Sequence, residues 1–217
     1  MLKAVIFDMD GVLVDSPKYN KIAFQRIMAE HGIAISDDYH KRHLGASFRD
    51  TIADVEKTHG VKLPPLMSLS QKATAMQIEF LKADLKPNPL LKHFLRDIKK
   101  SGLKLAVGTA SMRYRAEKFL ELLGILNELD ALVTSDEVQH HKPSPDIYLE
   151  TARQLCVKPS ECIVIEDALS GIAAAKAAGM KVVGLVTQFH SAAELKNTDL
   201  VVESLTELKL DILKKLF

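Results

Sequence analysis

Residues 162–186 read CIVIEDALSGIAAAKAAGMKVVGLV and contain two apolar runs separated by a helical pattern. Both runs are nearly continuous in hydrophobic residues, which is typical of strands buried on both faces of a sheet. Between them, the alanine-rich segment from Leu169 favours a helix, and Gly179 fits the left-handed position that ends one. A strand, a helix and a second strand in this order predict a parallel sheet with right-handed crossovers.

The same alternation extends over most of the chain. Further apolar runs occupy residues 3–7, 103–107 and 131–134, and helical patterns cover residues 90–100, 114–123 and 146–155. In one interval, after the first run, no stretch reads as a strand, and helical patterns fill it at residues 17–31, 47–59 and 66–84. We therefore expect an α/β fold with helices on both faces of the sheet.

The long helical interval predicts an inserted domain. It begins after Asp15 and Ser16 and ends in the Lys-Pro-Asn-Pro sequence at residues 86–89, and both sequences are typical of hinges. We expect residues 1–16 and 87–217 to form the catalytic core and residues 17–86 to form a helical cap over one edge of the sheet. Movement of this cap on its hinges would gate the site.

Residues that carry chemistry follow each predicted strand. Because ligands of an open parallel sheet bind outside the carboxyl ends of the strands, we expect these side chains to share one site. The candidates are Asp8, Asp10, Thr109, Ala110, Lys142, Glu166 and Asp167.

The acidic members of this set predict a metal ion. Carboxylates that lie close together repel one another unless a cation is present. A set made only of oxygen ligands favours a hard ion, and Mg²⁺ fits it better than zinc. We therefore predict Mg²⁺, held by Asp8, Asp10, Glu166 and Asp167.

The remaining members suit phosphoryl transfer. A carboxylate such as Asp8 can attack phosphorus and form an aspartyl-phosphate. Thr109, the Ala110 N–H and Lys142 could then neutralise the oxygens of the transferring group. Asp10 could protonate the leaving oxygen and later deprotonate water, and we expect a neighbouring carboxylate to raise its pKa.

Each candidate also has an ordinary structural interpretation. Asp-Gly sequences favour turns, threonine can begin a loop, and lysine side chains are usually solvated. Proximity to Glu166 and Asp167 favours the functional interpretation for Asp8 and Asp10. For Ser111 we favour the structural one, as the N-cap of a helix that starts near Met112.

Composition excludes several other classes. The 217 residues include 29 Lys and Arg against 28 Asp and Glu, for a net charge of +1, so the basic excess of a nucleic-acid binder is missing. The two cysteines, Cys156 and Cys162, are too few for a disulfide framework and lack zinc-ligand spacing. Since no signal peptide or membrane-length apolar run is apparent, we expect a cytoplasmic protein with no membrane partner. The modest apolar content of the surface helices favours a monomer.

Four segments, in this order, resemble the four motifs of the haloacid dehalogenase (HAD) superfamily. They are FDMDGVLVDS at residues 7–16, VGTAS at 107–111, HHKPSPDIY at 140–148 and IEDALSGIAAAKAAGM at 165–180. The helical insert resembles the first cap class of that superfamily, as in β-phosphoglucomutase and phosphoglycolate phosphatase. The resemblance covers essentially the whole chain and implies a Rossmann-like parallel sheet.

The resemblance also implies roles for the candidate residues. Asp8 would be the nucleophile, and Asp10 the general acid and base whose backbone carbonyl also binds Mg²⁺. Thr109 and Lys142 would hold the transferring phosphate. Asp167 would bind Mg²⁺ directly, and Glu166 directly or through water.

In the insert, Gly45, Ser47 and Arg49 resemble the cap loop through which relatives inspect the substrate, and Asn20 lies in the first cap helix near the hinge. The structural alternative makes Ser47 a helix N-cap and places Arg49 in a solvated first turn.

Two enzymatic functions stay open at this stage, because a phosphoenzyme can donate to water or to a second sugar hydroxyl. In β-phosphoglucomutase, a histidine on the first cap helix helps to couple substrate binding to the general acid and base. A lysine and an arginine in the cap loop bind the second phosphate. This chain has Asn20, Leu44 and Phe48 at what resemble those three positions. We expect a phosphatase for a small phosphorylated metabolite such as a sugar phosphate, with a phosphomutase as the alternative. A dehalogenase has no use for Asp10, and a non-catalytic binding module would be expected to have lost Asp8 or Asp10.

Overall fold

The structure, a computed structural model, describes residues 1–14, 16–43, 46–84 and 89–217. At its centre lies a sheet in the order β3-β2-β1-β4-β5-β6, in which every pair of neighbours is parallel. The strands are β1 (Ala4–Phe7), β2 (Lys104–Gly108), β3 (Ala131–Val133), β4 (Cys162–Glu166), β5 (Lys181–Leu185) and β6 (Leu200–Val202). The predicted α/β class and parallel sheet are confirmed.

The first five strands agree with the apolar runs to within one residue at each end. The sequence analysis missed β6, since a three-residue edge strand gives little signal.

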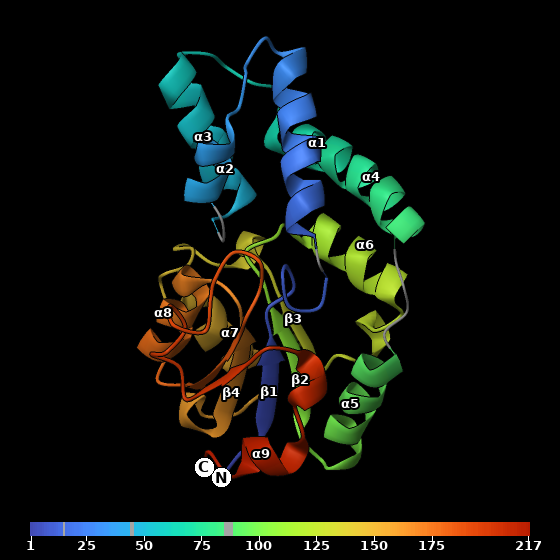
Figure 1. The fold of residues 1–217 in the computed structure, drawn as a ribbon, viewed down its shortest axis with the longest axis vertical. Coiled ribbons are helices and arrows are strands. Elements are labelled where there is room, and N and C mark those ends of the chain that lie inside the picture. The colour runs from blue at the N-terminus through green and yellow to red at the C-terminus, as the bar shows by residue number, and fades with distance from the viewer. Residues whose placement is uncertain (15, 44–45, 85–88) are drawn as a thin grey trace.

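Helices cover both faces of the sheet (Figure 1). Because side chains alternate along a strand, Val5 and Phe7 pack on one face while Ala4 and Ile6 pack on the other. The first face is covered by α5 (Pro89–Lys100), α6 (Arg113–Leu123) and α9 (Leu210–Lys214). The second is covered by α7 (Asp146–Gln154) and α8 (Leu169–Ala177). Short 3-10 helices are η1 (Leu126–Glu128), η2 (Ser135–Glu137), η3 (Pro159–Glu161) and η4 (Leu205–Glu207).

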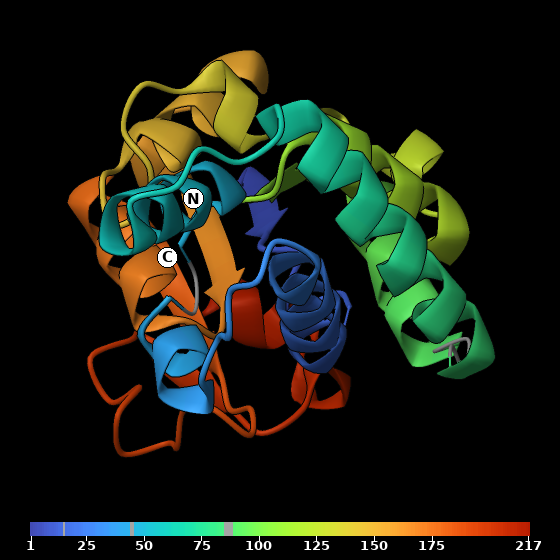
Figure 2. The same cartoon turned by 90° about the horizontal axis from the view of Figure 1, so that it is seen from above.

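The described residues between β1 and β2 form four helices before α5 begins. They are α1 (Pro17–Glu30), α2 (Asp37–Arg42), α3 (Phe48–His59) and α4 (Leu66–Asp84), of which α2 was not expected. Their apolar side chains form a cluster of their own, which includes Ile27, Met28 and Val55. Figures 1 and 2 show these helices above the sheet, at the end opposite the two chain termini.

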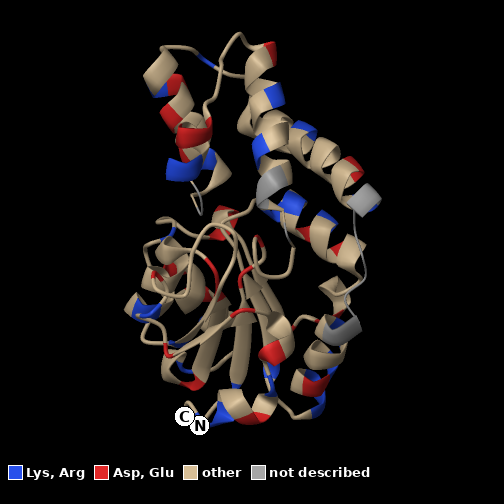
Figure 3. Cartoon of the chain, in the orientation of Figure 1, with Lys and Arg blue, Asp and Glu red and all other residues tan. Residues whose placement is uncertain are grey.

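The second predicted hinge falls largely on residues 85–88, outside the described residues, so the division into core and cap stays a prediction. Lys and Arg are interspersed with Asp and Glu over both the sheet part and the helical insert in the view of Figure 3. Within the described parts of the chain, we find no helix with the length and hydrophobicity that crossing a membrane requires.

Candidate active site

The strand order brings the predicted site residues together. Since β1 lies between β2 and β4, the residues that follow these three strands meet at one edge of the sheet. There they line a cavity of about 170 Å³ that also reaches the helical insert. The predicted residues on its wall are Asp8, Asp10, Asn20, Thr109, Ala110, Lys142, Glu166 and Asp167.

Lys142 is buried between two carboxylates. Its Nζ donates to Oδ1 of Asp8 and to Oε1 of Glu166, each at 2.7 Å, and to the carbonyl oxygen of Gly108 at 3.3 Å. The ammonium also lies 4.9 Å from the ring centre of Tyr148, whose hydroxyl donates to the same Glu166 oxygen at 2.9 Å. The solvated alternative for Lys142 is therefore wrong, because its side chain is only 2% exposed.

Asp8, Glu166 and Asp167 form an acidic cluster whose nearest oxygens lie within 4.8 Å of one another. Two glycines make room for it. A Cβ on Gly11, which has a φ of +89°, would lie 2.1 Å from Oδ2 of Asp167, and a Cβ on Gly171 would lie 1.5 Å from Oε1 of Glu166. Any larger residue at either position would displace a carboxylate of the cluster.

The two adjacent acids of the cluster differ in their hydrogen bonding. Lys142 and Tyr148 donate to Oε1 of Glu166, and the N–H groups of Asp167 and Ala168 donate to Oε2 at 2.9 Å. About four donors saturate a carboxylate, so Glu166 has its full complement. Among the described residues, none donates to the Asp167 carboxylate.

This arrangement disfavours the charged forms of two acids. Burial raises the pKa of Asp8 to about 7, with Lys142 opposing the shift and Glu166 adding to it. Burial and the neighbouring Glu166 and Asp8 raise the pKa of Asp167 to about 9. Asp167 has no donor among the described residues, and Asp8 has one, from Lys142. Buried carboxylates that lie this close together fit a cation, so the cluster could hold a metal ion.

Asp10 differs from the prediction. Burial raises its pKa, but an ion pair with Arg115 and hydrogen bonds from Ser16 and Ser111 lower it by more, to about 2. The expectation that a neighbouring carboxylate raises the pKa of Asp10 is therefore wrong for this arrangement. The predicted N-cap role of Ser111 is also wrong, because Met112 occupies that position and Ser111 Oγ donates to Asp10 at 2.7 Å.

Thr109 and Ala110 present hydrogen-bonding groups to the cavity. Oγ1 of Thr109 accepts the N–H of Ser111 at 3.1 Å, which leaves the threonine hydroxyl proton free to point at a ligand. The Ala110 N–H has no acceptor among the described residues. These two residues, Lys142 and Asp8 line the same cavity.

The motifs at this site match a known family over most of the chain. A model of the family described as haloacid dehalogenase-like hydrolase matches residues 5–185. The chain belongs to this hydrolase family.

Individual relatives in the haloacid dehalogenase-like hydrolase family are phosphatases and mutases. The chain is 33% identical to validoxylamine A 7'-phosphate phosphatase of Streptomyces hygroscopicus over 96% of its own length and 97% of the relative's. It is 34% identical to fructose-1-phosphate phosphatase of Escherichia coli, over 82% of this chain and 94% of that one. In structure it resembles β-phosphoglucomutase of Clostridium difficile, with a TM-score of 0.86, 27% identity, and coverage of 100% and 97% of the two chains.

The predicted cap residues of this haloacid dehalogenase-like hydrolase differ in whether they reach the cavity. Ser47 is the N-cap of α3 and accepts the N–H of Asp50 at 3.1 Å, as its structural interpretation predicts. It also lies 2.9 Å from Nδ1 of His141. Arg49 is exposed and does not line the cavity, and Gly45 lies outside the described residues. Asn20 does reach the cavity wall.

The sequence analysis did not identify Arg115, Gln77 and Tyr148 as residues of the site. Arg115 is bonded to Asp10 and to Gln77, and Tyr148 is bonded to Glu166. Arg115 lies in the first turn of a predicted helix, which is a weak signal because arginine on a helix is usually solvated. Gln77 comes from α4, and no local pattern relates it to the strand ends. Tyr148 ends the third motif and packs among apolar side chains. From the sequence alone, a tyrosine at this position indicates only packing.

Proposed function

We propose that the protein is a Mg²⁺-dependent phosphatase that hydrolyses a small phosphorylated metabolite, such as a sugar phosphate, through an aspartyl-phosphate on Asp8. The observation that carries this proposal is the placement of Asp8: buried at the end of β1, with Lys142 on one oxygen and the donors Thr109 and Ala110 N–H on the same wall. The phosphatase names of two relatives support the choice of a phosphoric ester.

Asp8 and Asp167 would be the direct ligands of Mg²⁺, because each keeps at least one carboxylate oxygen that accepts no hydrogen bond from the described residues. Glu166 would act through water, since its hydrogen bonds are complete. In addition to these carboxylates, the backbone carbonyl of Asp10 would complete the predicted ligand set. A bound Mg²⁺ neutralises phosphate oxygens and keeps the carboxylates ionised.

The first chemical step belongs to Asp8. Its carboxylate oxygen attacks phosphorus, the bond from phosphorus to the ester oxygen breaks, and the leaving oxygen takes a proton from Asp10. Lys142, Thr109 and the Ala110 N–H stabilise the charge on the transferring oxygens. An arriving phosphate adds negative charge beside Asp10 and raises its pKa, so the acid role belongs to the substrate-bound state.

The second step returns the enzyme to its starting form. Asp10 takes a proton from water, the water oxygen attacks phosphorus, and the bond to the Asp8 oxygen breaks to release inorganic phosphate. Both steps need a cavity from which bulk water is excluded. We propose that residues 17–86 serve as the cap for this purpose, because α1, α3 and α4 supply part of the cavity wall.

The charges on the cavity wall favour a phosphatase over a mutase. Among the described wall residues, the only Lys and Arg are Lys142, which is bound to the nucleophile, and Arg115, which is fully engaged by protein groups. Phe48 contributes a ring, and burial lowers the pKa of His40, which favours its neutral form. A bisphosphate intermediate would therefore find no free lysine or arginine for its second phosphate among the described wall residues.

A substrate screen tests the proposal. Purified protein should release phosphate from a panel of sugar phosphates with Mg²⁺ and lose this activity with a chelator, and Asp8→Asn should abolish it. Asp211→Asn, an exposed aspartate on α9, is the matched control and should retain activity. Isomerisation of β-glucose 1-phosphate faster than any hydrolysis would establish the mutase alternative. Activity that survives both chelation and Asp8→Asn would refute the mechanism.

A protein that binds sugar phosphates without turning them over would support the non-catalytic alternative. The expected partner is the small phosphorylated substrate and not a nucleic acid. Assembly as a monomer and residence in the cytosol stay predictions, which sedimentation analysis and cell fractionation would test.

A further inference from the structure

Arg115, on α6, uses every N–H of its guanidinium group. Nε donates to Oε1 of Gln77 at 2.8 Å, and Nη2 donates to Oδ1 of Asp10 at 2.6 Å and to Oδ1 of Asn20 at 2.8 Å. Nη1 donates to Oδ2 of Asp10 at 2.7 Å and to Oγ of Ser111. These are five bonds for five N–H groups, which leaves no donor for a substrate.

The Asp10 carboxylate is equally saturated. Besides the two bonds from Arg115, Oδ1 accepts the hydroxyl of Ser16 and Oδ2 accepts the hydroxyl of Ser111. Because an ionised carboxylate has about four acceptor positions, one hydroxyl contact must give way before a leaving oxygen or a water can reach Asp10. The bidentate ion pair, which is the stronger and more directional contact, would then fix the orientation of the carboxylate.

The same side chain joins the core to two helices of the insert. Arg115 belongs to α6, and its guanidinium lies 4.2 Å from the ring centre of Phe119 one turn further along. Its partner Asn20 belongs to α1, and its partner Gln77, which is 5% exposed, belongs to α4. The hydrogen bonds of one buried arginine therefore connect Asn20 and Gln77 of the insert helices to the Asp10 carboxylate.

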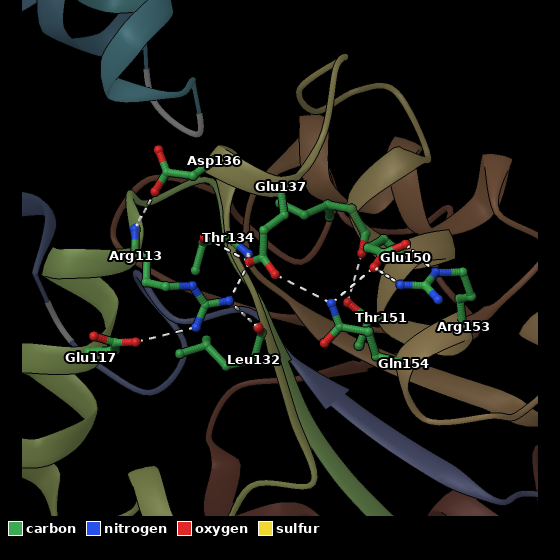
Figure 4. Close-up of polar contacts among 11 residues, drawn as sticks. Arg113, Glu117, Leu132, Thr134, Asp136, Glu137, Glu150, Thr151, Arg153 and Gln154 are labelled. Atoms are coloured by element: carbon green, nitrogen blue, oxygen red, sulfur yellow. Dashed lines mark hydrogen bonds and ion pairs between the residues drawn. The ribbon is translucent and has the colours of Figure 1, made fainter.

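A neighbouring arginine shows that this arrangement is particular to Arg115. Figure 4 shows Arg113, from the same helical turn, bound to Glu137 and to the carbonyl oxygen of Leu132, with its backbone N–H on Asp136. The side chain of Arg113 is 38% exposed and does not line the cavity. Arg113 thus serves as a matched control on the same helix.

We propose that Arg115 is a positioning residue for proton transfer: it orients the Asp10 carboxylate and makes this orientation depend on the insert helices α1 and α4. The inference rests on the proposed phosphatase function, in which Asp10 protonates the leaving oxygen. Esters with a poor leaving group need that proton, and aryl phosphates with an acidic phenol need it much less. Loss of Arg115 should therefore affect the two ester classes unequally.

The experiment compares Arg115→Met and Arg115→Lys with wild type and Arg113→Lys, on a sugar phosphate and on an aryl phosphate. Since general acid catalysis contributes about 10²–10⁴-fold, we expect Arg115→Met to lower kcat for the sugar phosphate at least about tenfold more than for the aryl phosphate. KM should change little. Arg115→Lys should recover part of the loss, because one ammonium replaces a bidentate contact. Arg113→Lys should behave as wild type.

A second set of variants tests the connection to the insert. Gln77→Ala and Asn20→Ala should each reproduce part of the unequal loss in the wild-type background. In the Arg115→Met background they should add nothing to it, because their effect passes through the same guanidinium. Equal losses on both esters, or additive losses in the double variants, would overturn the proposal and leave Arg115 a structural residue.

A measurement without turnover separates this inference from the proposed function. Hydrogen exchange in α1 and α4 should quicken in Arg115→Met and stay unchanged in Arg113→Lys, since only the first variant loses the bonds to Asn20 and Gln77. Unchanged exchange in both variants would contradict the connection. If wild type hydrolysed neither ester, the proposed function would fail, and the exchange result would still decide whether Arg115 holds the insert to the core.

Discussion

Replacing Asp167 by Asn should make the metal-free protein more stable and abolish its response to Mg²⁺. Asp167 is buried beside Asp8 and Glu166, and its pKa is raised to about 9 by burial first and by these two acids second. Asparagine has nearly the same shape and carries no charge. The substitution therefore removes the repulsion in the cluster together with one oxygen ligand of the proposed metal site.

The size of the gain follows from the pKa. A carboxyl group with a raised pKa keeps in the folded state a proton that the unfolded chain has lost, so stability falls as pH rises between the two pKa values. For Asp167 this window runs from the unfolded value of 3.8 to about 9. At about 1.4 kcal/mol per pH unit, the cost at pH 7 has an upper limit of about 4 kcal/mol. Asp8 lies in the same cluster and shares part of this repulsion, so the gain falls below the upper limit. We expect Asp167→Asn to raise the free energy of unfolding by about 1–4 kcal/mol.

Urea unfolding measures both effects. With a chelator at pH 7, Asp167→Asn should unfold at higher urea than wild type, and its stability should depend less on pH between 5 and 8. Addition of Mg²⁺ at about 100 times its Kd should stabilise wild type by about 3 kcal/mol and leave Asp167→Asn unchanged. Asp211→Asn should follow wild type throughout. A less stable Asp167→Asn in chelator, or an equal response to Mg²⁺, would refute the reasoning.

Three further substitutions test the surroundings of the cluster. Gly171→Ala would ordinarily stabilise a helix by about 0.5–1 kcal/mol. Here the new Cβ would lie 1.5 Å from Oε1 of Glu166, so urea unfolding should show a lower stability and a weaker response to Mg²⁺. A higher stability with an unchanged response would contradict this. Lys142→Met should lower kcat/KM by about 10²-fold or more. It should also destabilise the metal-free fold by about 3–5 kcal/mol, because the buried carboxylates of Asp8 and Glu166 lose the lysine ammonium between them. Near-normal turnover would contradict the phosphate role. Tyr148→Phe removes one hydrogen bond to Glu166 and should cost about 1 kcal/mol in thermal unfolding, with kcat/KM reduced less than tenfold; a loss as large as that of Lys142→Met would make the tyrosine a direct participant.

The sheet was predictable because its strands are buried on both faces. Such strands read as unbroken apolar runs, for example in β4, whose residues are all buried. The order of the strands is a different matter, since a parallel crossover from β1 to β2 or to β4 leaves the same local pattern in the sequence. The strand β6 and the helix α2 are short, and their few residues carry no readable period.

That the motif residues share one cavity was predictable for a similar reason: each motif follows a strand, and the ends of parallel strands meet at one edge. Arg115 and Gln77 were not predictable, because their roles arise only when α6 and α4 pack against each other. The predicted direction of the Asp10 pKa shift was wrong because the contact with Arg115 was not foreseen. The prediction placed Asp10 among carboxylates, whereas the folded chain supplies an arginine at 2.6 Å.

Glu166 and Asp167 show where the limit of the sequence lies. As adjacent acids at the end of one strand they are equivalent in any motif, and the sequence left open how Glu166 meets the metal. The turn after β4 directs the N–H groups of Asp167 and Ala168 at one Glu166 oxygen, while Lys142 takes the other. Glu166 thereby holds the lysine, whereas Asp167 has no donor among the described residues, and its charged form is disfavoured unless a cation is bound. The difference in hydrogen bonding between the two acids depends in part on the direction of two backbone N–H groups, which no side-chain pattern records.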